Sequence, residues 1–187
     1  MRIIAGQFRS QPLSAPKGWN TRPTSDRLRE TLFNVLAPRI EGSIFADLFA
    51  GTGAVGIEAL SRGANFVHFA ENSKLALATL RSNLERFPVD SQFAVDPAGT
   101  MPLLRRLAKR NITLDLVFLD PPYSDAAGYH DTLEFLAGSS ILSDGAVVVA
   151  EHARRTPLAS QYARLTRYRV LEQGDASLSF FAPLRRS

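Results

Sequence analysis

Short apolar runs alternate with helix-like stretches from about residue 40 onward. Five runs rich in Val, Ile, Leu, Phe and Ala lie at residues 43–49, 66–70, 92–95, 114–119 and 146–150. Between them, apolar side chains recur at helical spacing from the glycine-rich turn to residue 62, and over 73–86, 100–110 and 129–137. This alternation predicts βαβ units and a mostly parallel, doubly wound sheet of the Rossmann-like α/β class.

The C-terminal part of the chain departs from this alternation. Two strand-like runs, at 163–171 and 177–181, are separated by only five residues. A parallel pair would need a crossover of a dozen or more residues, so the two runs predict an antiparallel hairpin at the edge of the sheet.

The first 40 residues have a different character. They predict a small hairpin from residues 2–8 and 11–15, a turn-rich stretch over 16–23, and a helix over 25–36 that Pro38 closes. We therefore expect an N-terminal extension over 1–40 followed by one α/β domain over 41–187.

The positive charge of the chain is concentrated in this extension. The chain carries a net charge of +4, whereas residues 1–40 hold seven basic and two acidic residues, which leaves the remainder at −1. Of the 22 basic residues only three are lysines, and arginine is the side chain that binds phosphate bidentately and stacks on bases. A solvated basic surface would explain the charge equally well, but the pattern also favours a polyanionic partner such as RNA or DNA.

Composition excludes several classes of site. The chain has no cysteine, so it has neither disulfides nor a thiolate metal site nor a thiol nucleophile. No apolar run approaches the roughly 20 residues of a membrane helix, and the N-terminus lacks the pattern of a secretory signal. No His, Asp and Glu spacing indicates a metal site. We expect a cytoplasmic protein that needs neither a metal nor a membrane.

A glycine-rich turn follows the first apolar run. Gly51, Gly53 and Gly56 match G-x-G-x-x-G between a predicted strand and a predicted helix, an arrangement that lets a nucleoside-type ligand approach the backbone. Glu71 ends the second run, 20 residues after Gly51, where a carboxylate can accept hydrogen bonds from ribose hydroxyls. A tight turn without a ligand is the alternative.

Two acids bear on which cofactor the turn would bind. Asp47 lies four residues before Gly51, where a carboxylate would repel a pyrophosphate and attract a cationic amino group. S-adenosylmethionine (SAM) has an ammonium and no phosphate, so it fits better than a dinucleotide. Asp96 ends the third run and could accept a hydrogen bond from the adenine amino group, although an Asp-Pro turn explains it equally well.

The tetrad Asp120, Pro121, Pro122 and Tyr123 follows the fourth run. Ligands of open α/β sheets lie at the carboxyl ends of the strands, so the tetrad should lie beside the cofactor. The Asp120 carboxylate and a proline carbonyl can accept both N–H groups of an exocyclic amino group on a base, while Tyr123 stacks on the base. The two prolines would hold these groups in place. The tetrad predicts amino-nitrogen methylation, which needs no cysteine nucleophile; a plain Pro-Pro turn is the alternative.

Four stretches together resemble the RsmD family: RIIAG at 2–6, RPTSDRLRETLFNVL at 22–36, DLFAGTGAVGIEALSRG at 47–63 and VFLDPPY at 117–123. The resemblance implies a class I SAM-dependent methyltransferase that methylates guanine N2 in bacterial small-subunit (16S) ribosomal RNA. The tetrad alone is shared by enzymes that act on adenine N6, cytosine N4 and guanine N2, so the choice of guanine comes from the resemblance.

The expected site follows from the motifs and the resemblance together. The expected cofactor-binding residues are Asp47, Phe49, Gly51, Thr52, Gly53, Glu71 and Asp96. The expected catalytic residues are Asp120, Pro121, Pro122 and Tyr123. The expected RNA-binding residues are Arg2, Arg9, Arg22, Arg27 and Arg29. We expect a monomer whose partner is 16S rRNA or a partly assembled small subunit. The alternatives are an adenine-N6 methyltransferase on DNA or another RNA, an NAD(P)-dependent oxidoreductase and a non-catalytic RNA-binding module.

Overall fold

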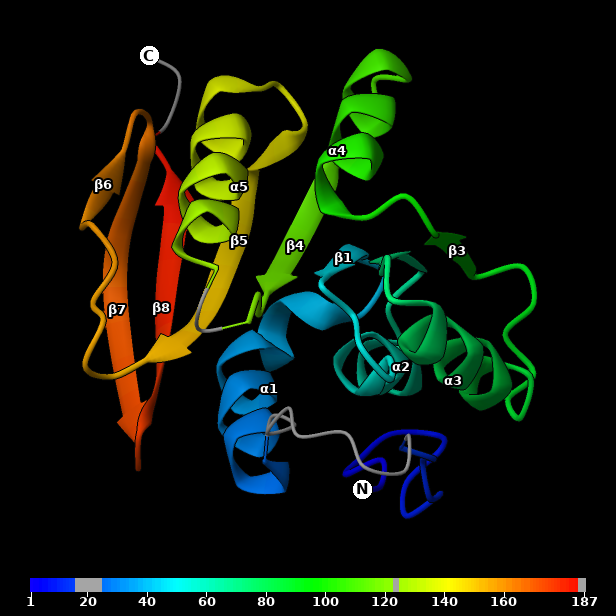
Figure 1. The fold of residues 1–187 in the computed structure, drawn as a ribbon. Helices are drawn as coiled ribbons and strands as arrows, with labels where there is room; N and C mark the ends of the chain where they lie inside the picture. Colours follow the sequence, from blue (N-terminus) through cyan, green and yellow to red (C-terminus); the bar gives the residue numbers. More distant parts are fainter. Residues whose placement is uncertain (16–24, 123–124, 185–187) are drawn as a thin grey trace.

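The computed structural model describes residues 1–15, 25–122 and 125–184 and contains an eight-stranded sheet in the order β3-β2-β1-β4-β5-β8-β7-β6 (Figure 1). The strands are β1 (Ile44–Leu48), β2 (Phe66–Ala70), β3 (Phe93–Asp96), β4 (Leu114–Leu119), β5 (Leu142–Ala153), β6 (Gln161–Tyr162), β7 (Leu165–Gln173) and β8 (Ala176–Pro183). The helices are α1 (Asp26–Ile40), α2 (Ala54–Ser61), α3 (Lys74–Leu84), α4 (Thr100–Lys109) and α5 (Ala126–Gly138).

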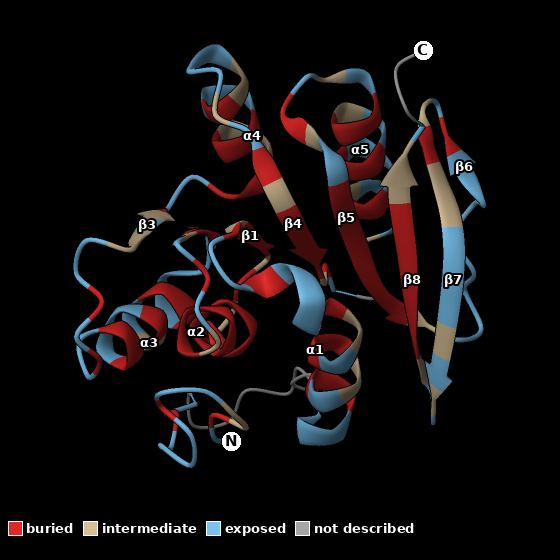
Figure 2. Ribbon diagram, turned by 180° about the vertical axis from the view of Figure 1, so that it is seen from behind, coloured by how far each residue is buried: buried red, intermediate tan, exposed pale blue. Residues whose placement is uncertain are grey.

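Helices cover both faces of the sheet, as expected for a doubly wound fold. One apolar core joins α1, α2 and α3 to one face, through side chains such as Phe33, Ile57 and Leu80. A second core joins α4 and α5 to the other face, through side chains such as Leu104 and Leu133. The two cores explain why β1, β2 and β4 are mostly apolar, with one polar residue each, since both faces of these strands are buried (Figure 2).

The predicted parallel sheet is confirmed. Strands β1 to β5 pair in parallel, with β1 between β2 and β4. The order of the strands reverses between β1 and β4, so the switch point of the fold lies at their carboxyl ends.

The predicted C-terminal hairpin is also confirmed. Strands β7 and β8 pair antiparallel, and β8 pairs antiparallel with β5. The sequence pattern did not predict β6, which has two residues and pairs with the start of β7.

The N-terminal extension packs on the α/β domain. Residues 2–8 and 11–15 pair as expected, through hydrogen bonds such as the one from the Ile3 amide to the Gln11 carbonyl, but they form only one isolated bridge instead of two regular strands. Ile3 and Phe8 belong to the same core as α1 and α2. The turn-rich stretch over 16–23 lies outside the described residues.

Helix α1 begins as predicted and ends later than predicted. The Ser25 hydroxyl accepts a hydrogen bond from the Leu28 amide, which caps the helix. The prediction that Pro38 closes the helix is wrong, because α1 continues to Ile40 with Pro38 in its last turn. Leu36 and Ile40, one turn apart, are both buried, so core packing outweighs the hydrogen bond that the proline removes.

Candidate active site

The register of the sheet aligns the ends of four strands. Leu48 of β1 pairs with Ala70 of β2 and Leu119 of β4, and Ala70 pairs with Asp96 of β3. Glu71, Phe49 and Asp120 are therefore the next residues at one edge of the sheet. Three strand spacings separate Asp96 from Asp120, or roughly 14 Å at about 4.8 Å each. The predicted cofactor residues and the tetrad thus lie side by side along the carboxyl edge.

The glycine-rich turn begins with a strained residue. Phe49 has a φ of 67°, a left-handed conformation that costs a non-glycine residue roughly 1–3 kcal/mol and that is common at functional sites. Gly53 has a φ of 81°, and a Cβ atom there would lie 2.3 Å from the Leu80 Cδ1 atom. Only glycine fits at position 53, where the chain enters α2.

The side chain of Asn83 in α3 holds the glycine-rich turn in place. Its side chain is fully buried, and its Nδ2 atom donates to the carbonyls of Thr52 at 3.0 Å and of Ser14 at 3.1 Å. Its Oδ1 atom accepts from the Ser14 amide at 2.9 Å. Asn83 therefore joins the glycine-rich turn to the N-terminal extension, and no local motif in the sequence predicted it.

Asp47 is buried beneath the turn. Its Oδ2 atom accepts a hydrogen bond from the Gly56 amide at 2.8 Å, which ties the end of β1 to the first turn of α2. Burial raises the pKa of Asp47 to about 7, against the opposing effect of the Gly56 N–H, and the charge of Glu71 raises it further. A cation bound nearby would stabilise the ionised carboxylate.

Glu71 is half-buried at the end of β2. Its Oε2 atom accepts from the Gly51 amide at 2.8 Å and its Oε1 atom from the Ser73 amide at 2.7 Å. A carboxylate has about four acceptor positions, so each oxygen keeps a lone pair for a ribose hydroxyl. The two amides hold the carboxylate in one orientation.

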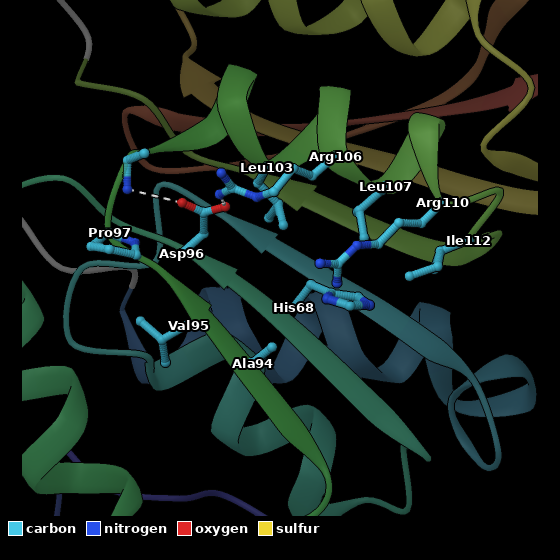
Figure 3. A pocket seen from close by; sticks show the side chains of 11 residues that line it. His68, Ala94, Val95, Asp96, Pro97, Leu103, Arg106, Leu107, Arg110 and Ile112 are labelled. Carbon is cyan, nitrogen blue, oxygen red and sulfur yellow. Dashed lines mark hydrogen bonds and ion pairs between the residues drawn. The ribbon is translucent and has the colours of Figure 1, made fainter.

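Asp96 lies at one end of a cavity of about 380 Å³ between β3 and α4 (Figure 3). Its Oδ1 atom accepts from the Ala98 amide at 2.9 Å, and its Oδ2 atom forms an ion pair with Arg106. His68 lines the other part of the cavity, and burial lowers the pKa of this imidazole to about 4, so it is neutral. The carboxylate of Asp96 is thus oriented by α4, an interaction that the sequence did not predict.

The structure describes the first three residues of the tetrad. Pro121 is buried, and the Pro122 carbonyl accepts from the Asp125 amide at 2.7 Å. The Tyr129 hydroxyl lies 2.8 Å from the Glu151 carbonyl oxygen and 3.3 Å from the Pro121 carbonyl oxygen. The one hydroxyl proton of Tyr129 favours the shorter contact with Glu151, and the hydroxyl also contacts the carbonyl that was expected to meet the base, a position that its sequence context did not reveal. Tyr123 lies outside the described residues.

Of the expected RNA-binding arginines, Arg2, Arg9 and Arg27 are exposed. Arg22 lies outside the described residues. The expectation for Arg29 is wrong, because its side chain is fully buried.

The buried side chain of Arg29 links the N-terminal extension to α2. Its Nη2 atom donates to the Arg2 carbonyl and to Asp26, each at 2.7 Å. Its Nη1 atom lies 3.9 Å from Glu58, which is also fully buried. The Glu58 carboxylate in turn accepts from the amides of Ile4 and Ala5. A glutamate inside the apolar run of α2 was the one signal in the sequence that could have revealed this network.

Among the described residues, no group of three or more His, Asp or Glu side chains could hold a metal ion. Within the same residues, no helix is both long and apolar enough to span a membrane.

Comparison with known proteins agrees with this geometry. Residues 1–182 match the model of the family described as "Conserved hypothetical protein 95". The chain belongs to this family. This match, together with the ribosomal RNA methyltransferases among the relatives below, confirms the resemblance to the RsmD family.

Individual relatives extend the comparison. The "Ribosomal RNA small subunit methyltransferase D" of Escherichia coli (strain K12) is 36% identical over 151 residues, 81% of this chain and 74% of that protein. YlbH of Bacillus subtilis is 35% identical over 158 residues, 84% of this chain and 85% of that protein. The solved structure of yhhF from Escherichia coli is 32% identical, with a TM-score of 0.86 over 100% of this chain and 99% of that chain.

Proposed function

We propose that the protein is a SAM-dependent methyltransferase that methylates the exocyclic N2 amino group of a guanine in small-subunit (16S) ribosomal RNA. The observation that carries the proposal is the register that aligns Leu48 with Leu119, since it brings the Asp-Pro-Pro turn beside the glycine-rich turn. The name of the Escherichia coli relative, a ribosomal RNA small subunit methyltransferase, supports RNA as the substrate.

The residues of the carboxyl edge fit SAM. Gly51 and Gly53 leave the backbone open, the fixed carboxylate of Glu71 would accept from the ribose hydroxyls, and Asp96 would accept from the adenine amino group. The buried carboxylate of Asp47 would favour the ammonium of the methionine part, and Phe49 and Thr52 would line the same turn. When bound, SAM supplies an activated methyl group.

Asp120 would orient the target nitrogen. The lone pair of an exocyclic amino group is delocalised into the ring, which makes this nitrogen a poor nucleophile. The Asp120 carboxylate and the Pro121 carbonyl would each accept one N–H, which holds the nitrogen and turns its lone pair toward the methyl group. A carbonyl has two lone pairs, so Pro121 can accept from the base beside its contact with Tyr129. The proton lost after transfer passes to Asp120 or to water, and Tyr123 would stack on the base.

The exposed arginines of the extension would meet the RNA. Arg2, Arg9 and Arg27 are exposed, and Arg22 would extend this set. We propose that residues 1–40 face the RNA and that residues 41–187 form the methyltransferase domain. The substrate would be 16S rRNA or a partly assembled small subunit in the cytoplasm, and the protein would act as a monomer.

The variant Asp120→Ala tests the proposal. We expect methyl transfer to bacterial 16S rRNA or small subunits to fall at least a hundredfold, while SAM affinity measured by calorimetry stays within about twofold. Asp131→Ala is the matched control, because it removes an exposed carboxylate of α5 and should leave both quantities unchanged. A large loss of SAM binding in Asp120→Ala would contradict the assigned role, and binding of NADH in place of SAM would favour the oxidoreductase alternative.

A further inference from the structure

Tyr168 is an unusual exposed residue in the C-terminal hairpin. Its side chain is 55% exposed on β7, and among the described residues it is the only aromatic in the group of exposed large hydrophobic side chains. Its ring lies 6.3 Å from that of Phe180, which is fully buried in the core beneath it. One side of the ring is thus supported by the protein and the rest is open to solvent.

Two arginines flank this ring. Arg169 is the next residue of β7, and Arg39 comes from the last turn of α1. Partial burial raises the pKa of the Tyr168 hydroxyl, and the positive charges of Arg39 and Arg169 act against this rise. The Arg39 Nη1 atom donates to the Gly145 carbonyl of β5 at 2.8 Å, which holds this side chain at the sheet.

The two arginines carry uncompensated charge. Both are exposed, and neither forms an ion pair with an acidic residue in the described part of the chain. Strand β6 pairs with Leu165 and Thr166, and the Arg167 amide donates to the Ser160 carbonyl at 2.8 Å, so within the described residues no strand pairs with the outer edge of β7 beyond Arg167 (Figure 2). Arginines on an open edge also prevent pairing with another sheet, but that role does not require an exposed aromatic ring between them.

From these observations we infer that Tyr168, Arg39 and Arg169 form a second RNA-binding surface that stacks on and neutralises a single-stranded segment of the substrate. An aromatic face flanked by guanidinium groups is the combination that binds unpaired nucleotides, since the ring stacks on a base and the arginines contact phosphates. The inference rests on the proposed function for the identity of the RNA.

The position of this surface suits a substrate held at Asp120. Strands β4, β5, β8 and β7 are consecutive neighbours, so Tyr168 lies three strand spacings away, roughly 14 Å. Arg169 pairs with Phe180, Phe180 with Val149 and Val149 with Phe118, which places Tyr168 between two and three residues before the level of Asp120 along the strands, or roughly 8 Å. The total of roughly 16 Å corresponds to a few nucleotides of a strand that contacts both places.

The test is an affinity series with a bacterial 16S rRNA transcript and with purified small subunits. Tyr168→Ala should raise the Kd for the transcript roughly 5- to 100-fold, because one stacked base is lost. Tyr168→Phe keeps the ring and should bind within about twofold of the parent. Leu75→Ala removes a similarly exposed apolar side chain from α3, 56% exposed, and should not change the Kd. Equal melting temperatures of the Ala and Phe variants would show that the fold is intact.

The salt dependence of RNA binding tests the contribution of Arg39 and Arg169 separately. The double variant Arg39→Ala and Arg169→Ala should reduce the slope of log Kd against log salt by about 1.4, since each phosphate contact on a single strand contributes about 0.7. Arg105→Ala, an exposed arginine on α4 at the other face of the sheet, serves as the charge control.

Three outcomes would overturn the inference. The first is an unchanged Kd for the transcript in Tyr168→Ala, and the second is an equal loss of salt dependence in Arg105→Ala. The third is weaker binding to subunits with unchanged binding to naked rRNA, which would assign the surface to a ribosomal protein. The affinity series does not depend on methyl transfer, so failure of the parent protein to methylate rRNA would count against the proposed function alone.

Discussion

Replacing Asp47 with asparagine tests how burial beneath the glycine-rich turn affects stability. Asp47 is 2% exposed, and its Oδ2 atom accepts from the Gly56 amide at 2.8 Å. An asparagine oxygen can accept the same hydrogen bond, so Asp47→Asn keeps the link between β1 and α2 and removes only the charge. The variant therefore isolates the cost of ionising a buried carboxyl group.

The magnitude follows from the pKa. Burial raises the pKa of Asp47 from 3.8 to about 7, so the folded protein holds this proton more tightly than the unfolded chain does. The resulting stabilisation is complete below about pH 4 and is lost as the pH rises through 7. A pKa difference of one corresponds to about 1.4 kcal/mol. The parent loses this stabilisation with rising pH and Asp47→Asn does not, so the free energy of unfolding of the variant minus that of the parent should rise by about 3 kcal/mol between pH 5 and pH 8.

Urea unfolding of both proteins at pH 5, 6, 7 and 8 measures this difference. Asp115→Asn is the matched control, because the Asp115 carboxylate also accepts a backbone hydrogen bond, from Ile44 at 2.9 Å, but is half-exposed. A difference between Asp47→Asn and the parent that stays constant from pH 5 to pH 8 would refute the reasoning. An equal pH-dependent gain in Asp115→Asn would assign the effect to net charge and not to burial.

Two further predictions concern residues that the sequence pattern did not reveal. Glu58→Ala should destabilise the protein by about 3–5 kcal/mol in urea unfolding, because it leaves the buried Arg29 with Asp26 as its one carboxylate and removes the acceptor of the Ile4 and Ala5 amides; a loss below about 1 kcal/mol would contradict the network, and Glu58→Gln should lose less. Tyr129→Phe should lower kcat for methyl transfer roughly tenfold at unchanged SAM affinity, because the hydroxyl that contacts both the Glu151 and the Pro121 carbonyls is lost beside the target nitrogen; an unchanged kcat would remove Tyr129 from the site.

The strands of the sheet were predictable because short stretches of the sequence determine where each strand begins and ends. Parallel strands buried on both faces are mostly apolar, so β2 and β4 coincide with the predicted runs, and the turn residues after each run fix where each strand ends. The placement of Glu71 and Asp120 at one edge then follows from topology alone.

The remainder depends on contacts between distant parts of the chain. Arg29 was expected to meet RNA, yet its environment is set by Glu58 and Ala54, more than 20 residues away. The ion pair of Asp96 with Arg106 and the contact of Tyr129 with Pro121 likewise join separate elements. The spacing of residues within one helix or strand does not identify partners on another element, so these roles became visible only in the structure.

The central claim is methylation of guanine N2 in small-subunit rRNA, and the most direct measurement is transfer of tritiated methyl from SAM to small subunits from a strain that lacks this gene. The labelled rRNA is digested to nucleosides and the labelled position is mapped. We predict that the parent protein places the label in N2-methylguanosine at one position of the 16S rRNA and that Asp120→Ala places none. Label in N6-methyladenosine, or no transfer to rRNA or subunits by a protein that binds SAM, would contradict the account.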